Sequence, residues 1–300
     1  MPENRVELEF SKMPNATGGI IRTLFAGRPA QAPENRLGIS YRATWKGGRA
    51  DPAVLARYRN LVGMSDDGTI PTMYIHALVM PLRLTMMTHG AFPMRLMGLV
   101  HFTNRIEVTR PIRADETFDI VSTIEGIKVT EKGQAFDAVT ELSVGGEVVW
   151  KEIATFLAPL PPGKRAKDGK PAAPKPEEPD WGEPIATWNV PGNAGRVFSS
   201  IASDINPIHM SAFTAKLFGF KRAIAHGMFS AGRCYAEILK TTPIESPVAI
   251  DVRFKRPLFI PGKVALHAIK DADDTRFLLK VLPKGEPHVE GRISKLQSST

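Results

Sequence analysis

The sequence has one cysteine, few aromatic residues and no long apolar run. Cys234 alone excludes an internal disulfide and a multi-cysteine zinc site, and we expect it to be a small core residue. No segment approaches the ~20 uncharged apolar residues of a membrane-spanning helix, and Met1–Glu7 lacks the apolar run of a signal peptide. We therefore expect a cytoplasmic protein without a membrane span.

Several motifs of common enzyme classes are also missing. The spacing around Ser230 differs from the G-x-S-x-G of hydrolases, and no G-x-G-x-x-G follows a predicted strand. The basic run Gly163–Lys170 precedes Pro171, so it does not form a phosphate loop. The seven histidines show no metal-ligand spacing. Nucleotide hydrolysis, hydride transfer and metal catalysis lose support, and we expect neither a cofactor nor a metal.

The composition is that of a globular protein with an anionic partner. Its 300 residues, 43% of them hydrophobic and 23% charged, are enough for two domains of usual size. The net charge of +8 favours binding of an anion. Because Lys and Arg are scattered and only four Trp and four Tyr accompany them, the composition favours a small phosphate-bearing ligand over nucleic acid as the anionic partner.

The first half predicts helices followed by a sheet. The first forty residues show no clear period, and we expect an irregular lead-in there. Asp51-Pro52 is a cap followed by proline, so a helix should begin there and end at Gly63. Apolar residues at helical spacing predict a largely buried helix over 73–88, kinked near Pro81. The period then changes to two, which predicts antiparallel strands over 106–109, 118–124, 136–142 and 148–155.

The second half repeats this order after a proline-rich stretch that is too polar to fold alone. Its predicted elements are helices over 207–219 and 225–240 and strands over 248–255, 263–269 and 276–282. Ile106–Ile112 also resembles Val252–Leu258 at the same place in the order. We therefore predict a duplicated α+β unit with domains at 1–157 and 183–300 and a linker at 158–182.

One loop of the second half combines a carboxylate with an imidazole. Asn206 is a good N-cap and Pro207 favours the first helical position, so a helix should begin there and stop at Gly219. The positive end of that helix should keep Asp204 ionised and His209 neutral, ready to accept a proton. The same residues are also ordinary capping chemistry, and a histidine near a helix start is often only packed.

A second motif, Ala225–Met228, lies where a long apolar helix should begin. The first backbone N–H groups of a helix have no partner within it and can polarise a carbonyl oxygen. Gly227 would let a ligand approach closely, or it would only permit tight helix packing. His226 is more often a cap or a supporting residue than a catalyst.

These two motifs, in this order, resemble the signature of MaoC-like, R-specific enoyl-CoA hydratases over roughly residues 185–285. The first half resembles a degenerate copy of the same hot-dog unit, a central helix wrapped by an antiparallel sheet. The resemblance implies a double hot-dog lyase of fatty acid metabolism that reversibly hydrates trans-2-enoyl thioesters to (R)-3-hydroxyacyl thioesters. It also implies that Asp204 and His209 hold a water, that the Gly227 N–H binds the thioester oxygen, and that Asn206 braces the loop.

The resemblance extends to the substrate side of the site. The partner would be an acyl-CoA or acyl carrier protein thioester, bound near Met228, with Lys221, Arg222 and Arg256 as candidates for the CoA phosphates. Ser203 is a departure, because the family usually has glycine there, where a positive φ or a close approach is needed. A homodimer of double hot-dogs is compatible with the resemblance.

The two halves differ in function. The first half has no D-x-N-P-x-H motif, so one active site per chain is expected. Seven of the eleven methionines fall between Met64 and Met97, and these flexible side chains line a groove for the acyl chain or only fill a core. Two other functions stay open: a hot-dog thioesterase, for which Glu237 is the only carboxylate on the central helix, and a non-catalytic acyl-thioester-binding protein.

Overall fold

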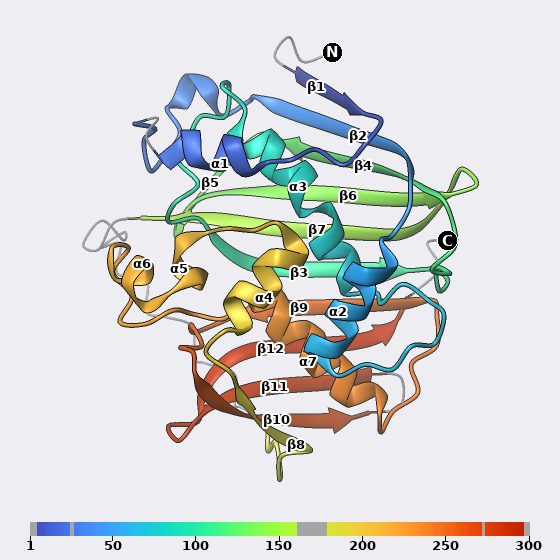
Figure 1. The fold of residues 1–300 in the computed structure, drawn as a ribbon. Coiled ribbons are helices and arrows are strands. Elements are labelled where there is room, and N and C mark those ends of the chain that lie inside the picture. Colours follow the sequence, from blue (N-terminus) through green and yellow to red (C-terminus); the bar gives the residue numbers. More distant parts are fainter. Residues whose placement is uncertain (1–4, 25–26, 161–178, 272–273, 297–300) are drawn as a thin grey trace.

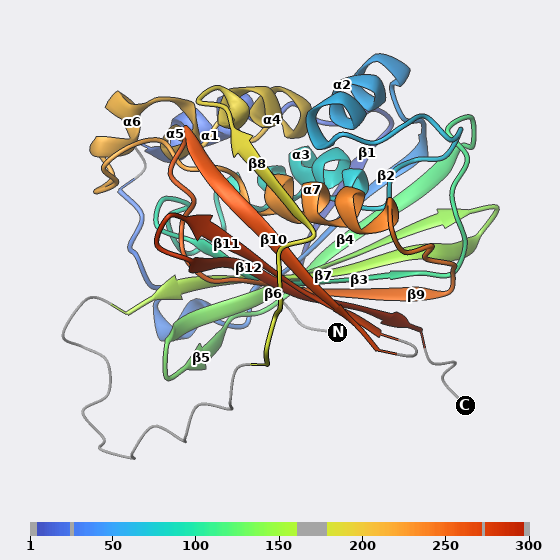
Figure 2. The same ribbon diagram turned by 90° about the horizontal axis from the view of Figure 1, so that it is seen from below.

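The fold is a large sheet with helices on one face. The computed structural model describes residues 5–24, 27–160, 179–271 and 274–296. Figure 2 shows the labelled helices together on one face of the sheet. Among the described residues, no helix is long and apolar enough to cross a membrane.

The strands are β1 (Arg5–Phe10), β2 (Ser40–Gly48), β3 (Val100–Val108), β4 (Phe118–Glu125), β5 (Lys128–Thr130), β6 (Gly133–Val144), β7 (Glu147–Pro159), β8 (Ala186–Val190), β9 (Val248–Phe254), β10 (Gly262–Lys270), β11 (Asp274–Leu282) and β12 (Glu286–Lys295). The helices are α1 (Thr17–Leu24), α2 (Pro52–Val62), α3 (Tyr74–Thr88), α4 (Ala194–Ala202), α5 (Pro207–Met210), α6 (Ala212–Lys216) and α7 (Gly227–Leu239), with a short 3-10 turn at Glu34–Arg36.

The two halves of the chain share one sheet, whose order among the described residues is β1-β2-β4-β6-β7-β3-β9-β12-β11-β10-β8, with β5 paired to β6. The halves meet where β3 pairs antiparallel with β9, with Ile106 opposite Ile250. The two similar segments, Ile106–Ile112 and Val252–Leu258, begin in these neighbouring strands. Arg105 of β3 and Asp251 of β9 add an ion pair of 2.7 Å across the junction.

Each half places one long helix against its part of the sheet. In Figure 1, α3 lies over the strands of the first half and α7 over those of the second half. Most side chains of both helices are buried, as expected when apolar residues occupy several faces. This is the double hot-dog arrangement that the sequence predicts, and the helix starts at Pro52 and Pro207 are confirmed.

The predicted irregular lead-in is wrong, because the segment forms β1 and α1 and then enters β2 at Ser40. β1 is an edge strand that pairs with β2 in parallel, so the sheet is not purely antiparallel. Its outward positions carry Arg5, Glu7 and Glu9. A half-exposed edge strand buries little apolar surface, and its sequence pattern is correspondingly weak.

The second half also differs from the prediction in detail. The predicted helix over 207–219 is interrupted at Ser211, which has φ −157° and ψ 163° and caps α6 by accepting a hydrogen bond from the Thr214 N–H. Neither α4 nor β12 was predicted. Most of the predicted linker, residues 161–178, lies outside the described residues, and the domain boundaries stay a prediction.

α4 fixes the position of the loop that carries the first motif. A Cβ added at Gly195 of α4 would lie 2.1 Å from the backbone oxygen of His209 in α5. The glycine therefore permits a backbone-to-backbone approach that no other residue allows. Its neighbour Gly192 has more room, since the nearest atom to an added Cβ is Pro261 Cδ at 3.4 Å.

We predict that Gly195→Ala separates α4 from α5 and lowers the free energy of unfolding by about 1–3 kcal/mol. The physical reason is overpacking against a backbone atom that cannot rotate away. Chemical denaturation followed by circular dichroism measures the change. Gly192→Ala is the matched control and should change stability by much less. Equal stability of the two variants would contradict the proposed contact.

Candidate active site

The loop after α4 is built around a left-handed residue. Ser203 ends α4 with φ 54° and ψ 23°, and it is the only non-glycine residue with positive φ in the described part of the chain. Asp204 follows, and its Oδ1 accepts a hydrogen bond of 3.2 Å from the Asn206 N–H. Asn206 in turn caps α5 by accepting from the Ile208 N–H at 3.3 Å. Serine thus adopts a left-handed conformation that glycine adopts more readily.

His209 is buried in α5 with one ring nitrogen committed to the backbone. Its Nδ1–H donates to the Ile224 carbonyl oxygen over 2.8 Å, because a carbonyl can only accept. Nε2 is therefore the nitrogen that makes no hydrogen bond within the described part of the chain. Burial lowers the pKa of His209 below its ordinary value, although Asp204 and the Ile224 carbonyl act to raise it. The neutral state predicted from the sequence is supported, but burial is the leading cause and α5 has only one turn.

His226 completes a cluster that the sequence pointed to only weakly. Its ring stacks on His209 with 3.6 Å between centroids, and its Nε2 lies 3.6 Å from Asp204 Oδ2. Neither ring nitrogen has a hydrogen-bond partner among the described residues. Burial, followed by the neighbouring His209, lowers the pKa of His226 well below its ordinary value. The partly exposed carboxylate of Asp204 and two buried imidazoles therefore lie close together.

Gly227 begins α7 beside this cluster. A Cβ added there would lie 2.5 Å from two ring atoms of Phe254. The glycine is therefore needed for packing, and its place at the first helical position also leaves its N–H without an acceptor within the helix. The predicted start of this helix at Ala225 lies two residues too early.

A cavity of about 740 Å³ brings both halves of the chain to this cluster. From the second half it is lined by Asp204, Asn206, His209, His226, Gly227 and Met228. From the first half it is lined on α3 by His76, Met80, Leu84 and Met87. Of the methionines between Met64 and Met97, only Met80, Met87 and Met97 reach this wall. The remaining methionines of that stretch lie elsewhere.

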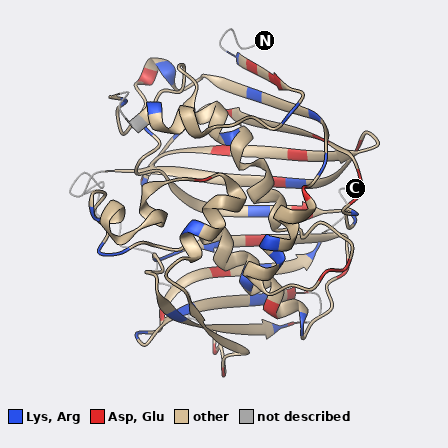
Figure 3. Ribbon diagram, viewed as in Figure 1, with Lys and Arg blue, Asp and Glu red and all other residues tan. Residues whose placement is uncertain are grey.

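The predicted phosphate-binding residues are only partly at the cavity. Arg256 lines it and is exposed, together with Lys255 and Arg95. Lys221 and Arg222 are exposed but are not among the lining residues, and Arg222 donates a hydrogen bond to the Pro261 carbonyl. Elsewhere, Lys and Arg are interspersed with Asp and Glu over strands and helices (Figure 3).

The donor atoms of Asp204, His209 and His226 are of the types that hold a metal, and they lie within 4.8 Å of one another. A metal lies in the plane of the imidazole it binds, about 2 Å from the nitrogen. The two rings are stacked at 27°, so their planes do not meet at such a distance. The arrangement suits proton transfer through a water better than tetrahedral zinc binding.

Two histidines of the first half were not predicted as site residues. His76 and His101 both line the cavity, and their rings stack with 5.2 Å between centroids. His76 belongs to an apolar stripe of α3. The only feature of the sequence that could have identified it as a site residue is a histidine at a core-facing position of this helix. His101 lies in β3 next to the junction of the two halves.

The chain is similar to proteins of known family and structure. The MaoC-like domain model matches residues 188–288. The 3-hydroxyacyl-thioester dehydratase X of Mycobacterium tuberculosis is 31% identical over 246 residues, covering 82% of this chain and 86% of that protein. The crystal structure of HtdX from the same organism superposes with a TM-score of 0.73 at 28% identity, covering 85% of this chain and 100% of that one. A MaoC-like dehydratase of Phytophthora capsici shares the fold, with a TM-score of 0.70 at 19% identity over 89% of this chain and 98% of that one. The chain therefore belongs to the MaoC-like dehydratase family of hydro-lyases.

Proposed function

We propose that the protein interconverts trans-2-enoyl thioesters and (R)-3-hydroxyacyl thioesters by adding or removing water. The observation that carries this proposal is the meeting of Asp204, His209 and Gly227 on one cavity wall. The similarity to a 3-hydroxyacyl-thioester dehydratase supports the same substrate class.

In the hydration direction the residues divide the work as follows. A water lies between the carboxylate of Asp204 and Nε2 of His209. Nε2 takes one proton from the water, and the water oxygen forms a bond to C3 of the enoyl group. The electron pair of the double bond moves toward the thioester oxygen. The resulting imidazolium, next to Asp204, returns that proton to C2. Elimination of water follows the reverse path.

The thioester oxygen gains negative charge during this addition. The N–H of Gly227, at the start of α7, is the proposed donor to that oxygen. One such donor typically contributes on the order of 3 kcal/mol to the transition state. Because Gly227 also packs closely on Phe254, its backbone position is firmly fixed.

The geometry favours this reaction over thioester hydrolysis. Glu237, the carboxylate that a thioesterase mechanism would use, forms ion pairs with Arg233 and Lys240 and does not line the cavity. A purely binding role is disfavoured because the cavity contains a carboxylate and a neutral imidazole whose Nε2 is free. Binding alone requires neither.

We further propose that the first half of the chain holds the acyl chain. Met80, Leu84 and Met87 form one stripe of α3 along the cavity, and all three side chains are otherwise buried. Flexible apolar side chains suit an apolar ligand of variable shape. The exposed Arg95 and Arg256 on the same cavity are the proposed partners of the CoA phosphates. The choice between CoA and carrier protein, the cytoplasmic location and the homodimer stay predictions.

We expect Asp204→Asn and His209→Ala each to reduce hydration of crotonyl-CoA by at least about 100-fold, because His209 transfers the proton and the Asp204 carboxylate holds the water and stabilises the imidazolium. The assay follows loss of the enoyl absorbance, while a thiol reagent reports free CoA. Glu237→Gln, which also removes a carboxylate but outside the cavity, should retain activity. A fully active Asp204→Asn protein would refute the mechanism, and release of free thiol would indicate hydrolysis.

The pH dependence of activity follows from the lowered pKa of His209. Because Nε2 must be unprotonated to take a proton, kcat/KM for hydration should decrease only below the ordinary imidazole pKa of about 6.5. A decrease centred at or above that pH would contradict the assignment.

The free energy of unfolding must be measured in the same buffers, because it also depends on pH. Burial lowers the pKa of His288 to about 4, so the unfolded chain binds more protons and the free energy of unfolding falls between about pH 6.5 and 4.

The acyl-chain proposal predicts a preference that depends on α3. Activity on enoyl-CoA substrates should not fall as the chain grows beyond crotonyl, and Leu84→Trp should restrict activity to short chains by narrowing the cavity. Leu78→Trp, the same change on α3 away from the cavity, is the control. Wild-type activity that decreases steadily with chain length would refute the proposal.

A further inference from the structure

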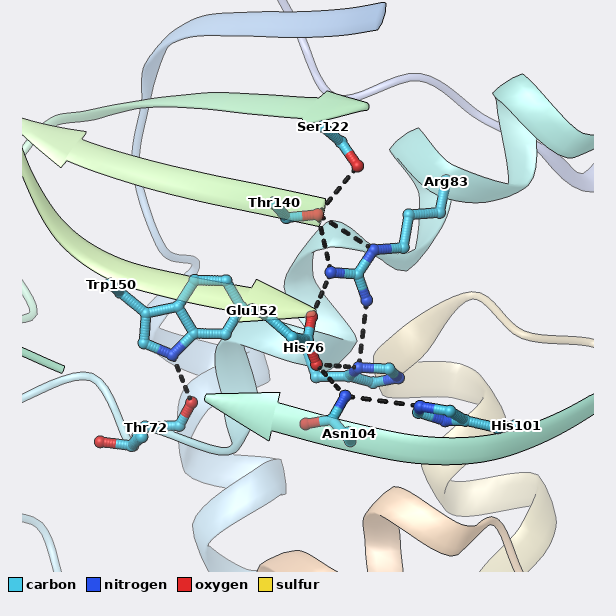
Figure 4. A network of polar contacts seen from close by, with 9 residues as sticks. All are labelled: Thr72, His76, Arg83, His101, Asn104, Ser122, Thr140, Trp150 and Glu152. Atoms are coloured by element: carbon cyan, nitrogen blue, oxygen red, sulfur yellow. Dashed lines mark hydrogen bonds and ion pairs between the residues drawn. The ribbon is translucent and has the colours of Figure 1, made fainter. Parts of the chain in front are cut away.

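The first half contains a buried polar network (Figure 4), of which His76 and His101 also line the cavity. Arg83 of α3 and Glu152 of β7 are both fully buried and form an ion pair. Arg83 also donates to Thr140 Oγ1 over 2.7 Å, and Asn104 donates to Glu152. The pair thus satisfies its own charges, as buried ions must to be tolerated.

His76 is attached to this network through one nitrogen. Burial alone would raise the pKa of Glu152, but Arg83 and His76 hold it well below its ordinary value, so the carboxylate is ionised. An ionised carboxylate only accepts, so the 2.6 Å contact fixes the proton on His76 Nδ1. Arg83 lies 3.1 Å from the same nitrogen and cannot donate to it. With its proton on Nδ1, the ring presents Nε2 as an acceptor.

That acceptor belongs to the cavity wall. His76 lines the cavity at the end of the stripe that continues through Met80, Leu84 and Met87. Nε2 has no hydrogen-bond partner among the described residues. His226 lines the same cavity. One oriented acceptor therefore stands in an apolar wall close to the reacting groups.

Stability explains only one of the two ring nitrogens. The bond from Nδ1 helps to hold the buried Glu152 carboxylate, whereas Nε2 takes no part in that network. The stacked ring of His101 and the bond to Glu152 restrict rotation of His76. Ligand-binding groups are commonly held in one orientation by neighbouring contacts, as His76 is here, with one acceptor left for the ligand.

We propose that Nε2 of His76 accepts a hydrogen bond from the bound thioester. The donor is either a hydroxyl group on the acyl chain or an amide N–H of the pantetheine arm, since both are donors in a ligand of this class. The inference rests on the proposed function, because that function supplies the ligand. It makes His76 a specificity-determining residue, since a ligand without the donor leaves the buried acceptor unpaired.

The test measures binding rather than turnover. Saturated acyl-CoAs, their ω-hydroxy derivatives of graded length, and S-ethyl thioesters, which have neither donor, are titrated against the full-length protein. His76→Asn removes the acceptor alone, because the shorter amide side chain can still donate to Glu152 but does not reach the position of Nε2. His76→Gln places an amide oxygen near that position. Met80→Leu, one turn along the stripe, is the control.

We expect His76→Asn to weaken binding of donor-bearing ligands about tenfold and His76→Gln to restore much of it, with unchanged thermal unfolding. A loss confined to ω-hydroxy ligands identifies the acyl hydroxyl as donor, and a loss shared by all CoA ligands identifies the pantetheine amide. Undiminished binding of every ligand, or an equal loss for the S-ethyl thioesters, overturns the proposal. Wild-type protein that binds but does not hydrate enoyl thioesters refutes the proposed reaction alone, whereas protein that binds no ligand overturns both.

Discussion

Backbone pairing of β3 with β9 is the interaction on which the site depends. It makes one sheet of the two halves, so that α3 and α7 lie on the same face and share a cavity. Neither half encloses that cavity alone, because the reacting groups come from the loop at Asp204 and much of the apolar wall comes from α3. The ladder of hydrogen bonds fixes the register of the two strands, and with it the distance between the two walls.

The two halves use buried polar residues in different ways. In the first half, Arg83 and Glu152 neutralise each other and leave one acceptor at the cavity. In the second half, Asp204, His209 and His226 are brought together with few partners among the described residues, and burial keeps the imidazoles neutral. A satisfied network gives rigidity, whereas groups without partners can exchange protons with a ligand.

Much of the fold could be read from the sequence, and the reasons are local. The helix at Pro52 and the start at Pro207 were predictable because a cap and a proline act within one turn. The break at Ser211 and the whole of α4 were not, because packing decides them: Gly195 allows α4 to touch the His209 carbonyl, and nothing in the local pattern reports that approach. His226 and His76 were undervalued for the same reason, since a lone histidine acquires a role only from its neighbours.

Ser203 shows that the loop depends on a backbone conformation and not on a particular residue. A left-handed conformation destabilises the folded state by about 1–2 kcal/mol for a residue other than glycine. Serine loses less conformational freedom than glycine on folding, and this difference offsets up to about 1 kcal/mol of that cost. The net free-energy cost of serine at this position is therefore small enough for the loop to fold in this conformation. Sequence patterns that demand glycine before the aspartate would therefore overlook chains like this one, whereas a search for a left-handed residue that ends a helix and precedes the aspartate would find them.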